Sequence, residues 1–325
     1  MDKYKVVVTG PIMPAALALL EQQCEVRQWT EVQPPRLGQL AEWLKDAEGL
    51  FVSANVAVNE ELLDVAPKLR VIAQAAVGYD NIDVQACTQR KIPFANTPGV
   101  LVETTADLAF GLLLTAARRI HESWDWVRAG KWQPGSRFPL GVDLYGKTLG
   151  IVGMGAIGAA VAKRAQTSGM KVIYYNRRPR ADAAALHVEY RNFETLLAEA
   201  DFIIVLTPLT PETRGMFGAN EFEKMKPTAY FINVARGAIV DTDALRNALA
   251  SNKIAYAALD VTDPEPLPAS HPLLQLTNLL IVPHIGSATT ECRNRMALLA
   301  AENMLLGLAG KPMLTCVNKE VNYIV

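Results

Sequence analysis

Apolar residues along the chain fall into short runs separated by segments of helical periodicity. In the first hundred residues such runs lie at 4–9, 25–28, 49–53, 69–74 and 92–95. Each run has the length and apolar character of a buried strand. The segments between them, from about 14 and at 37–47, 59–65 and 84–90, have the pattern of helices. This alternation predicts a parallel sheet covered by helices.

A second series of strands follows after residue 147. Its apolar runs lie at 148–152, 171–175, 202–206, 230–233, 256–259 and 279–282. Their spacing predicts a second doubly wound sheet. Between the two series, Thr97-Pro98-Gly99 precedes a helix expected at 102–120, whose middle is almost wholly apolar. A helix that is apolar on every side has to be buried, so we expect it between the domains or in a subunit interface.

A glycine-rich turn follows the first strand of the second series. Gly153 permits a tight turn, Gly155 lets the backbone approach a pyrophosphate, and Gly158 lets the next helix pack closely on its strand. The free N–H groups at the start of that helix, at Ala156 and Ile157, then face the phosphates. Because the motif stands between a buried strand and an Ala-rich helix, it predicts dinucleotide binding rather than a plain strand–helix turn.

Composition and charge narrow the class of protein. The 325 residues suit about two domains, and 32 basic against 33 acidic side chains give no basic surface for nucleic acid or membranes. The charge-free stretch 148–162 is shorter than the roughly 18 residues of a membrane span, and the N-terminus has no signal-peptide pattern. The four cysteines lack metal-ligand spacing. We expect a cytoplasmic protein without a metal, whose partners are small molecules or another protein chain.

Five segments, in order along the chain, carry a resemblance to a known family. They are Val77 to Asn81, Gly150 to Gly158, Asn233 to Gly237, Asp260 through Pro266, and Pro283 to Ala288. With these residues the chain resembles the D-2-hydroxyacid dehydrogenases, and within them the glyoxylate/hydroxypyruvate reductase and 2-ketoacid reductase branch.

The resemblance implies an α/β fold of two doubly wound parallel-sheet domains. Residues 1–98 with 288–325 would form a flavodoxin-like substrate domain, and residues 99–287 an inserted Rossmann nucleotide domain. A homodimer built through the inserted domain is also implied. Trp124, Trp126 and Trp132 then suggest a dimer arm, with packing inside one chain as the alternative. Family alignment places Phe138 in a loop that can approach the partner's substrate cleft.

Three residues fit the chemistry of 2-oxo acid reduction. The reaction needs a cation for the carboxylate, an acid for the forming alkoxide, and an anion that keeps this acid charged. Arg236 matches the catalytic arginine of the family, and its planar fork suits a carboxylate. His284 follows a buried strand and is the expected acid, with Glu265 as its anion. Asp263 competes for the anion's role, but the family spacing selects Glu265.

Further residues are expected to bind the substrate or the cofactor. Strand ends in the first domain place Ser53 and the loop of Val77 and Gly78 at the substrate, with the loop N–H groups as donors to an anion. Thr207 and Pro208 end a strand of the second sheet and are expected at the cofactor. The resemblance implies that Asp260 binds the nicotinamide carboxamide, that Ala235 offers its carbonyl, and that Thr104 lies near the cofactor. A helix N-cap is the alternative role for Asp260.

The end of the second nucleotide-domain strand indicates which nicotinamide cofactor is used. An NAD site has an acidic residue there for the ribose 2′-OH, whereas an NADP site has arginine. The chain has Asn176, Arg177 and Arg178, and no carboxylate before Asp182. We therefore expect NADPH to be preferred and NAD also accepted, with a solvated basic turn as the alternative.

The predicted function is reduction of a small 2-oxo acid to the D-2-hydroxy acid. Glyoxylate, hydroxypyruvate and 2-ketogluconate all remain candidate substrates, because they differ mainly in loop contacts. The alternative is a nucleotide-sensing, corepressor-like binding protein of the same fold. Because the chain keeps Arg236, Glu265 and His284, the enzyme is the favoured interpretation.

Overall fold

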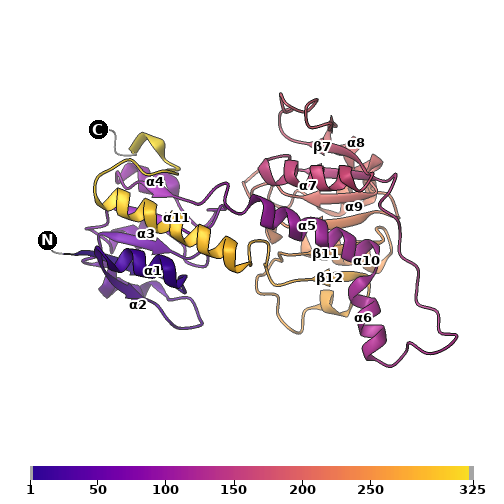
Figure 1. Cartoon of the computed structure of the whole chain (residues 1–325), viewed down its shortest axis with the longest axis horizontal. Coiled ribbons are helices and arrows are strands. Elements are labelled where there is room, and N and C mark those ends of the chain that lie inside the picture. Colours follow the sequence, from indigo (N-terminus) through magenta and orange to yellow (C-terminus); the bar gives the residue numbers. More distant parts are fainter. Residues whose placement is uncertain (1–2, 322–325) are drawn as a thin grey trace. The chain divides into compact units, whose positions relative to one another are not determined.

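The computed structural model describes residues 3–321, which fold into two compact units. The first unit takes in Met1–Leu101 and Ala288–Val325, and the second takes in Val102–Ser287 (Figure 1). Among the helices of residues 3–321, none is long and apolar enough to cross a membrane.

The first unit is a five-stranded parallel sheet with helices on both faces. Its strand order is β2-β1-β3-β4-β5, the flavodoxin-like order. The strands are β1 (Tyr4–Val8), β2 (Cys24–Gln28), β3 (Gly49–Val52), β4 (Val71–Gln74) and β5 (Phe94–Ala95). The helices are α1 (Pro14–Glu21), α2 (Leu37–Leu44), α3 (Glu60–Asp64), α4 (Val84–Gln89) and α11 (Thr290–Leu308).

Two separate cores hold these helices on the sheet. One joins α1 and α11 to one face, and the other joins α2, α3 and α4 to the opposite face. Helix α11 lies so close to β4 that a Cβ at Gly307 would stand 2.5 Å from Val71 Cγ2. The segment after α11 returns to β5, where Phe94 N donates to Asn318 Oδ1 (2.8 Å) and Val317 N donates to Phe94 O (2.8 Å). Val317 and Asn318 therefore belong to the first unit.

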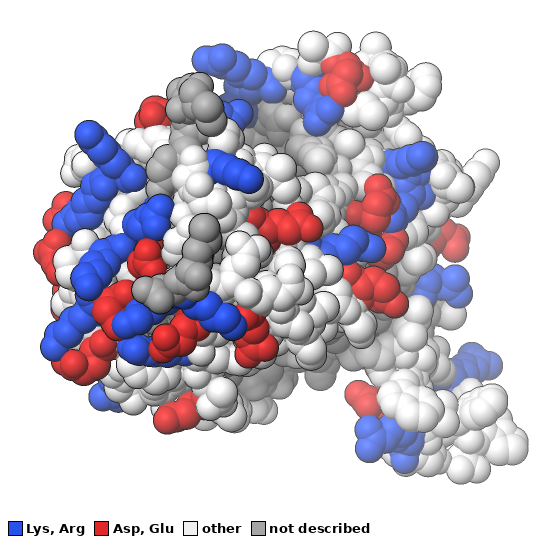
Figure 2. All heavy atoms as spheres, turned by 60° about the vertical axis from the view of Figure 1, so that its left-hand side comes forward, with Lys and Arg blue, Asp and Glu red and all other residues white. Residues whose placement is uncertain are grey.

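The charged side chains at the rim of the first unit are mixed in sign. On the face in Figure 2 basic and acidic side chains are intermixed. Asp46 pairs with both Lys5 and Arg27, and Arg70 pairs with Glu48. Exposed pairs of this kind are screened by solvent and add little to stability, so the apolar cores, and not this rim, hold the unit together.

The second unit is a seven-stranded parallel sheet in the order β12-β11-β10-β9-β6-β7-β8. Its strands are β6 (Thr148–Val152), β7 (Lys171–Tyr175), β8 (Glu189–Tyr190), β9 (Phe202–Val205), β10 (Tyr230–Asn233), β11 (Tyr256–Leu259) and β12 (Leu279–Ile281). Its helices are α5 (Val102–Ala117), α6 (Ile120–Arg128), α7 (Ala156–Thr167), α8 (Phe193–Glu199), α9 (Ala219–Lys224) and α10 (Thr242–Ala250). The strand order reverses at β6, where ligands bind in folds of this type. The predicted fold class, two doubly wound α/β domains, is confirmed.

The predicted helix at 102–120 is interrupted in the structure. Helix α5 ends at Ala117, and α6 begins at Ile120 after Arg119 adopts φ +53°. A left-handed residue cannot continue a right-handed helix, so the chain changes direction there. The apolar middle of α5 is buried within its own unit, in the core that it shares with α7, β10 and β11.

Candidate active site

His284 and Glu265 form the central pair of the candidate site. Their atoms Nδ1 and Oε1 are 2.6 Å apart, and both side chains are partly open, at 46% and 39% exposure. His284 follows β12 with φ +51°, a conformation in which histidine is more frequent than most residues. Because Nδ1 faces the carboxylate, Nε2 is the nitrogen left to exchange a proton with a substrate.

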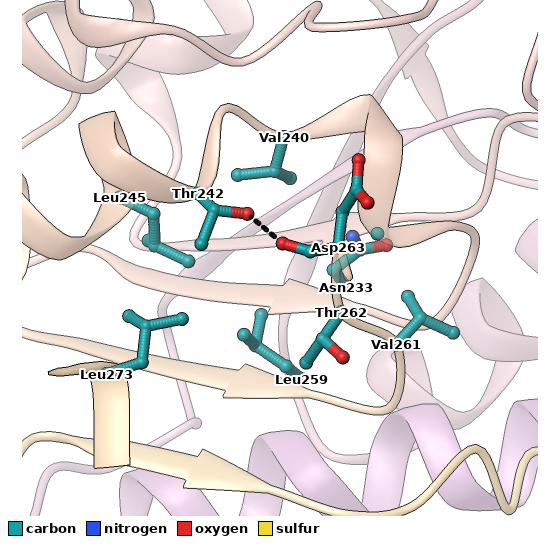
Figure 3. Close-up of a pocket in the computed structure, with 10 residues that line it drawn as sticks. Asn233, Val240, Thr242, Leu245, Leu259, Val261, Thr262, Asp263 and Leu273 are labelled. Atoms are coloured by element: carbon teal, nitrogen blue, oxygen red, sulfur yellow. Dashed lines mark hydrogen bonds between the residues drawn. The ribbon is translucent and has the colours of Figure 1, made fainter. Parts of the chain in front are cut away.

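Glu265 is held as an anion by its surroundings. Burial alone would raise its pKa, but the hydrogen bond and charge of His284 and a bond from Thr262 N to Oε2 (3.2 Å) outweigh burial, and the pKa is lowered. The carboxylate that contacts His284 is therefore Glu265 and not its predicted competitor Asp263. The carbonyl of Asp263 instead accepts a bond from Thr242 Oγ1 (2.7 Å), which ties the loop to α10 (Figure 3).

The cavity behind this loop is small. It lies between β10, β11 and α10, is lined by side chains such as Leu245, Leu259 and Leu273 (Figure 3), and measures about 10 Å³. A cavity of that size holds no more than about one water molecule. It therefore serves the packing of the loop and is not a substrate pocket.

Asp260 fixes the backbone that carries His284. Its main-chain carbonyl accepts from His284 N (2.9 Å), Oδ1 accepts from Ile285 N (2.6 Å), and Oδ2 accepts from Gly286 N (2.9 Å). Asp260 is 2% exposed, and burial raises its pKa. The alternative role as a helix N-cap is wrong, because the next helical turn, Pro272–Gln275, is capped by His271, and the Asp260 carboxylate binds N–H groups of a loop instead.

Arg236 stands on a loop shaped by Asn233. The buried Asn233 side chain donates from Nδ2 to Arg236 O (2.9 Å) and accepts from Ala235 N at Oδ1 (3.0 Å). The guanidinium of Arg236 donates to Ala235 O (2.8 Å), so this carbonyl already has a partner. A Cβ at Gly237 would lie 1.9 Å from Thr262 O. Only glycine therefore lets the Arg236 loop and the Glu265 loop meet.

The glycine turn has the shape that a pyrophosphate requires. Gly153 has φ +102°, and a Cβ there would lie 2.5 Å from Thr207 N; a Cβ at Gly158 would lie 2.7 Å from Gly153 O. By contrast, a Cβ at Gly155 would meet nothing within 4 Å. The turn leads into the N-terminus of α7 at Ala156 and Ile157. The space above Gly155 is thus free for a ligand at a helix N-terminus.

The end of β7 is joined to this turn by Asn176. Its Oδ1 accepts from Met154 N (2.7 Å), and its Nδ2 donates to Met154 O (3.2 Å). Both amide atoms of Asn176, which is predicted to contact the cofactor, thus form hydrogen bonds with the backbone of Met154. Arg177 and Arg178 are exposed.

Sequence reasoning missed Arg180. Its guanidinium donates to Met154 O (3.0 Å) and pairs with Asp182, with Nη2 and Oδ2 2.6 Å apart. Asp182 raises the pKa of Arg180 by this hydrogen bond. The sequence signal that could have identified Arg180 is its position two residues before Asp182, the first carboxylate after β7.

The other predicted residues of the second unit lie near these loops. Thr207 stands beside Gly153, and the exposed Pro208 follows it. Thr104 is half-buried in the first turn of α5. Its neighbour Thr105 is the residue that approaches the His284 loop, with Cγ2 3.5 Å from where a Cβ of Gly286 would be.

The predicted substrate residues of the first unit follow β3 and β4. Ser53 is bound to Thr9, which accepts from Ser53 N at Oγ1 (2.8 Å) and donates to its hydroxyl (3.2 Å). Ser53 therefore holds Thr9, the residue that directly follows β1, in place. The N–H groups of Val77 and Gly78 have no acceptor among residues 3–321, as an anion-binding loop requires.

Comparison with known proteins identifies the family. Residues 110–286 match the model of the D-isomer specific 2-hydroxyacid dehydrogenase, NAD binding domain. The chain is 46% identical over 322 residues to a glyoxylate reductase of Korarchaeum cryptofilum, covering 98% of this chain and 97% of the relative. It is also 46% identical to the mouse glyoxylate reductase/hydroxypyruvate reductase, covering 95% and 96%.

A solved structure agrees with these matches. The NADPH-dependent glyoxylate/hydroxypyruvate reductase of Sinorhizobium meliloti, in complex with NADP and malonate, has a TM-score of 0.90 and 32% identity. The match covers 100% of this chain and 99% of the Sinorhizobium chain. The chain therefore belongs to the D-isomer specific 2-hydroxyacid dehydrogenases and is an NAD(P)-dependent oxidoreductase.

Proposed function

We propose that this enzyme reduces glyoxylate and hydroxypyruvate, and that 2-ketogluconate is a further candidate substrate. The observation that carries the proposal is the 2.6 Å contact between His284 Nδ1 and Glu265 Oε1, on a loop that meets the Arg236 loop at Gly237. The names of the relatives support the choice of substrate. The corepressor-like alternative is not favoured. Turnover of a panel of 2-oxo acids by the purified protein tests the proposal, and absence of turnover would reject it.

Each unit has a proposed role. Residues 99–287 form the nucleotide domain. The residues proposed at the cofactor are the glycine turn, Asn176, Arg177, Arg178, Thr207, Pro208, Ala235, Asp260 and Thr104. Residues 1–98 with 288–325 form the substrate domain, with Val77, Gly78 and Ser53 at the substrate. The open space above Gly155 supports the nucleotide role.

The residues of the site would divide the reaction among themselves. A bound nicotinamide cofactor supplies the hydride. Arg236 holds the substrate carboxylate with its planar guanidinium. His284 donates the proton from Nε2 to the oxygen that becomes the hydroxyl, and Glu265 stabilises the imidazolium from the side of Nδ1. Asp260 keeps the histidine backbone in place through the N–H groups of Ile285 and Gly286.

Glu265→Gln should move the alkaline limb of the activity profile to lower pH. The lowered pKa of Glu265 keeps it ionised throughout the range in which a histidine titrates, so the wild type has a full negative charge beside the ring. The neutral amide removes that charge, and the imidazolium loses its stabilisation. Because both side chains are more than a third exposed, we expect a shift of about one pH unit.

The pH dependence of kcat/KM for glyoxylate measures this shift. Asp263→Asn is the matched control, because it removes a neighbouring carboxylate that does not contact His284. An unmoved limb in Glu265→Gln, or an equal shift in the control, would assign the role to another carboxylate.

We also propose a homodimer that buries the segment 124–138. Helix α6 has no buried residue, and Trp124 and Trp132 are 61% and 75% exposed. Phe138 packs on Trp126 of its own chain, with ring centroids 5.6 Å apart. Exposed aromatic residues grouped in this way are typical of interfaces.

Light scattering should return twice the 35.4 kDa of one chain. Trp124→Glu should lower the mass toward that of the monomer, since it places a charge in the interface. Leu314→Glu, at a position 63% exposed in the first unit, should leave the dimer intact. A wild-type monomer would contradict the proposal.

A further inference from the structure

The loop after β4 is held by its carbonyl groups. Four successive carbonyls accept bonds from the protein: Ala76 O from Thr97 N (2.9 Å), Val77 O from Asn96 Nδ2 (2.8 Å), Gly78 O from Gln74 Nε2 (2.8 Å) and Tyr79 O from Ile82 N (2.9 Å). Two of these donors are side-chain amides. No comparable contact holds the loop by its N–H groups in the part of the chain that the structure describes.

This pattern decides where the N–H groups point. In a planar trans peptide the C=O and the following N–H point in opposite directions. Thr97 therefore orients the N–H of Val77, and Asn96 orients the N–H of Gly78. Gln74 acts in the same way on the N–H of Tyr79. Each of these N–H groups therefore points away from the residue that donates to the carbonyl of the same peptide.

The two residues that carry these amides are themselves held in place. Asn96 is 8% exposed, and its main-chain carbonyl accepts from Thr315 Oγ1 (2.6 Å), which fixes the backbone next to its side-chain amide. The buried Asn303 of α11 in turn accepts from Thr315 N (3.1 Å) and donates to Thr315 Oγ1 (2.9 Å). Gln74 is fully buried, and its Oε1 accepts from Asn81 Nδ2 (3.1 Å). The C-terminal segment thus supports the loop through Asn96.

We propose that Asn96 is a positioning residue for the carboxylate of the substrate, because it sets the direction of the Gly78 N–H. The inference rests on the proposed function, in which the loop of Val77 and Gly78 binds that carboxylate. Without the Asn96 amide, the Val77–Gly78 peptide loses the bond that sets its orientation, and the Gly78 N–H points away from the substrate for part of the time. A donor that binds substrate and transition state alike changes KM and leaves kcat nearly constant.

The test is Asn96→Ala with Asn318→Ala as its matched control. Asn318 is an amide of the same unit, 2% exposed, that donates to Ile92 O (3.0 Å) and does not touch the loop. Asn96→Ala should raise KM for glyoxylate roughly three- to tenfold, the value of one hydrogen bond. Its kcat should stay within about twofold, and KM for the cofactor should not change. The control should keep the wild-type KM for glyoxylate.

A second readout separates this inference from the proposed function. Amide hydrogen exchange at Thr97 N, which bonds to Ala76 O, should speed up in Asn96→Ala and not in the control. If wild-type protein reduces no 2-oxo acid, the proposed function fails, and exchange still tests whether Asn96 holds the loop. An unchanged KM in Asn96→Ala, or an equal rise in the control, overturns the inference. If alanine prevents folding, Asn96→Ser takes its place with the same expected results.

Discussion

His284→Ala should lower kcat for 2-oxo acid reduction by a factor of about 10² to 10⁴, the usual contribution of a general acid. This loss follows from the surroundings of His284. Its Nδ1 lies 2.6 Å from an ionised carboxylate, and its side chain is 46% exposed, so that Nε2 can reach a substrate. Its removal leaves water as the proton donor to the forming alkoxide. Cofactor affinity should be kept, because the glycine turn does not contact the histidine loop in the hydrogen bonds of residues 3–321.

The structure provides a matched control for this substitution. His187 also has φ +51° and lies in the same unit, on the surface. His187→Ala therefore makes the same change in a left-handed backbone without touching the site, and it should leave kcat unchanged. His284→Asn, which tolerates the left-handed region better than alanine, should be as inactive as His284→Ala. Steady-state kinetics and cofactor titration measure both effects, and wild-type turnover by His284→Ala would exclude the assignment.

Asp260 explains why the histidine has a defined position despite its exposure. Three N–H groups, from residues 284, 285 and 286, bond to this one residue. An aspartate at the end of an apolar strand was visible in the sequence, and its link to the nicotinamide came from resemblance. Its actual partners depend on the path of a loop more than twenty residues later, which local patterns do not encode.

The sequence predicted those features that follow from local rules. Apolar runs identified the buried strands, and the glycine spacing placed a turn between β6 and α7, because only glycine fits where a Cβ at position 153 would meet Thr207 N at 2.5 Å. The break at Arg119 was missed, since neither glycine nor proline marks it. Arg119 pairs with Glu122 and lies over the ring of Phe138, and such contacts can override the local propensity of the chain.

Side-chain to backbone bonds were the least predictable part of the candidate site. The sequence predicted Asn176 at the cofactor but gave no sign that both its amide atoms bind Met154. Asn96 and Gln74 carried no signal, because a buried amide acquires a role only from the carbonyl that it reaches. The bonds of Asn96 and Asn176 join residues 19 and 22 positions apart, outside the range of helix and strand periodicity.

The wild-type enzyme should prefer NADPH over NADH by at least about tenfold in kcat/KM. The 2′-phosphate carries close to two negative charges, and Arg177 and Arg178 are exposed directly after Asn176. Charge-assisted hydrogen bonds to it contribute about 1.5–3 kcal/mol, which is one to two powers of ten in affinity. The nearest following carboxylate, Asp182, is paired with Arg180, and this positive charge offsets the repulsion that Asp182 would exert on the phosphate.

Arg177 should be the main contact, and single substitutions decide between the arginines. Arg177→Ala should lower kcat/KM for NADPH about tenfold and leave that for NADH nearly unchanged, because NADH has no phosphate for the guanidinium to bind. Arg178→Ala should have a smaller effect. Lys163→Ala removes an exposed positive charge from α7 of the same unit and should change neither value. Equal efficiency of the wild type with both cofactors would show that the arginines face solvent and do not select the cofactor.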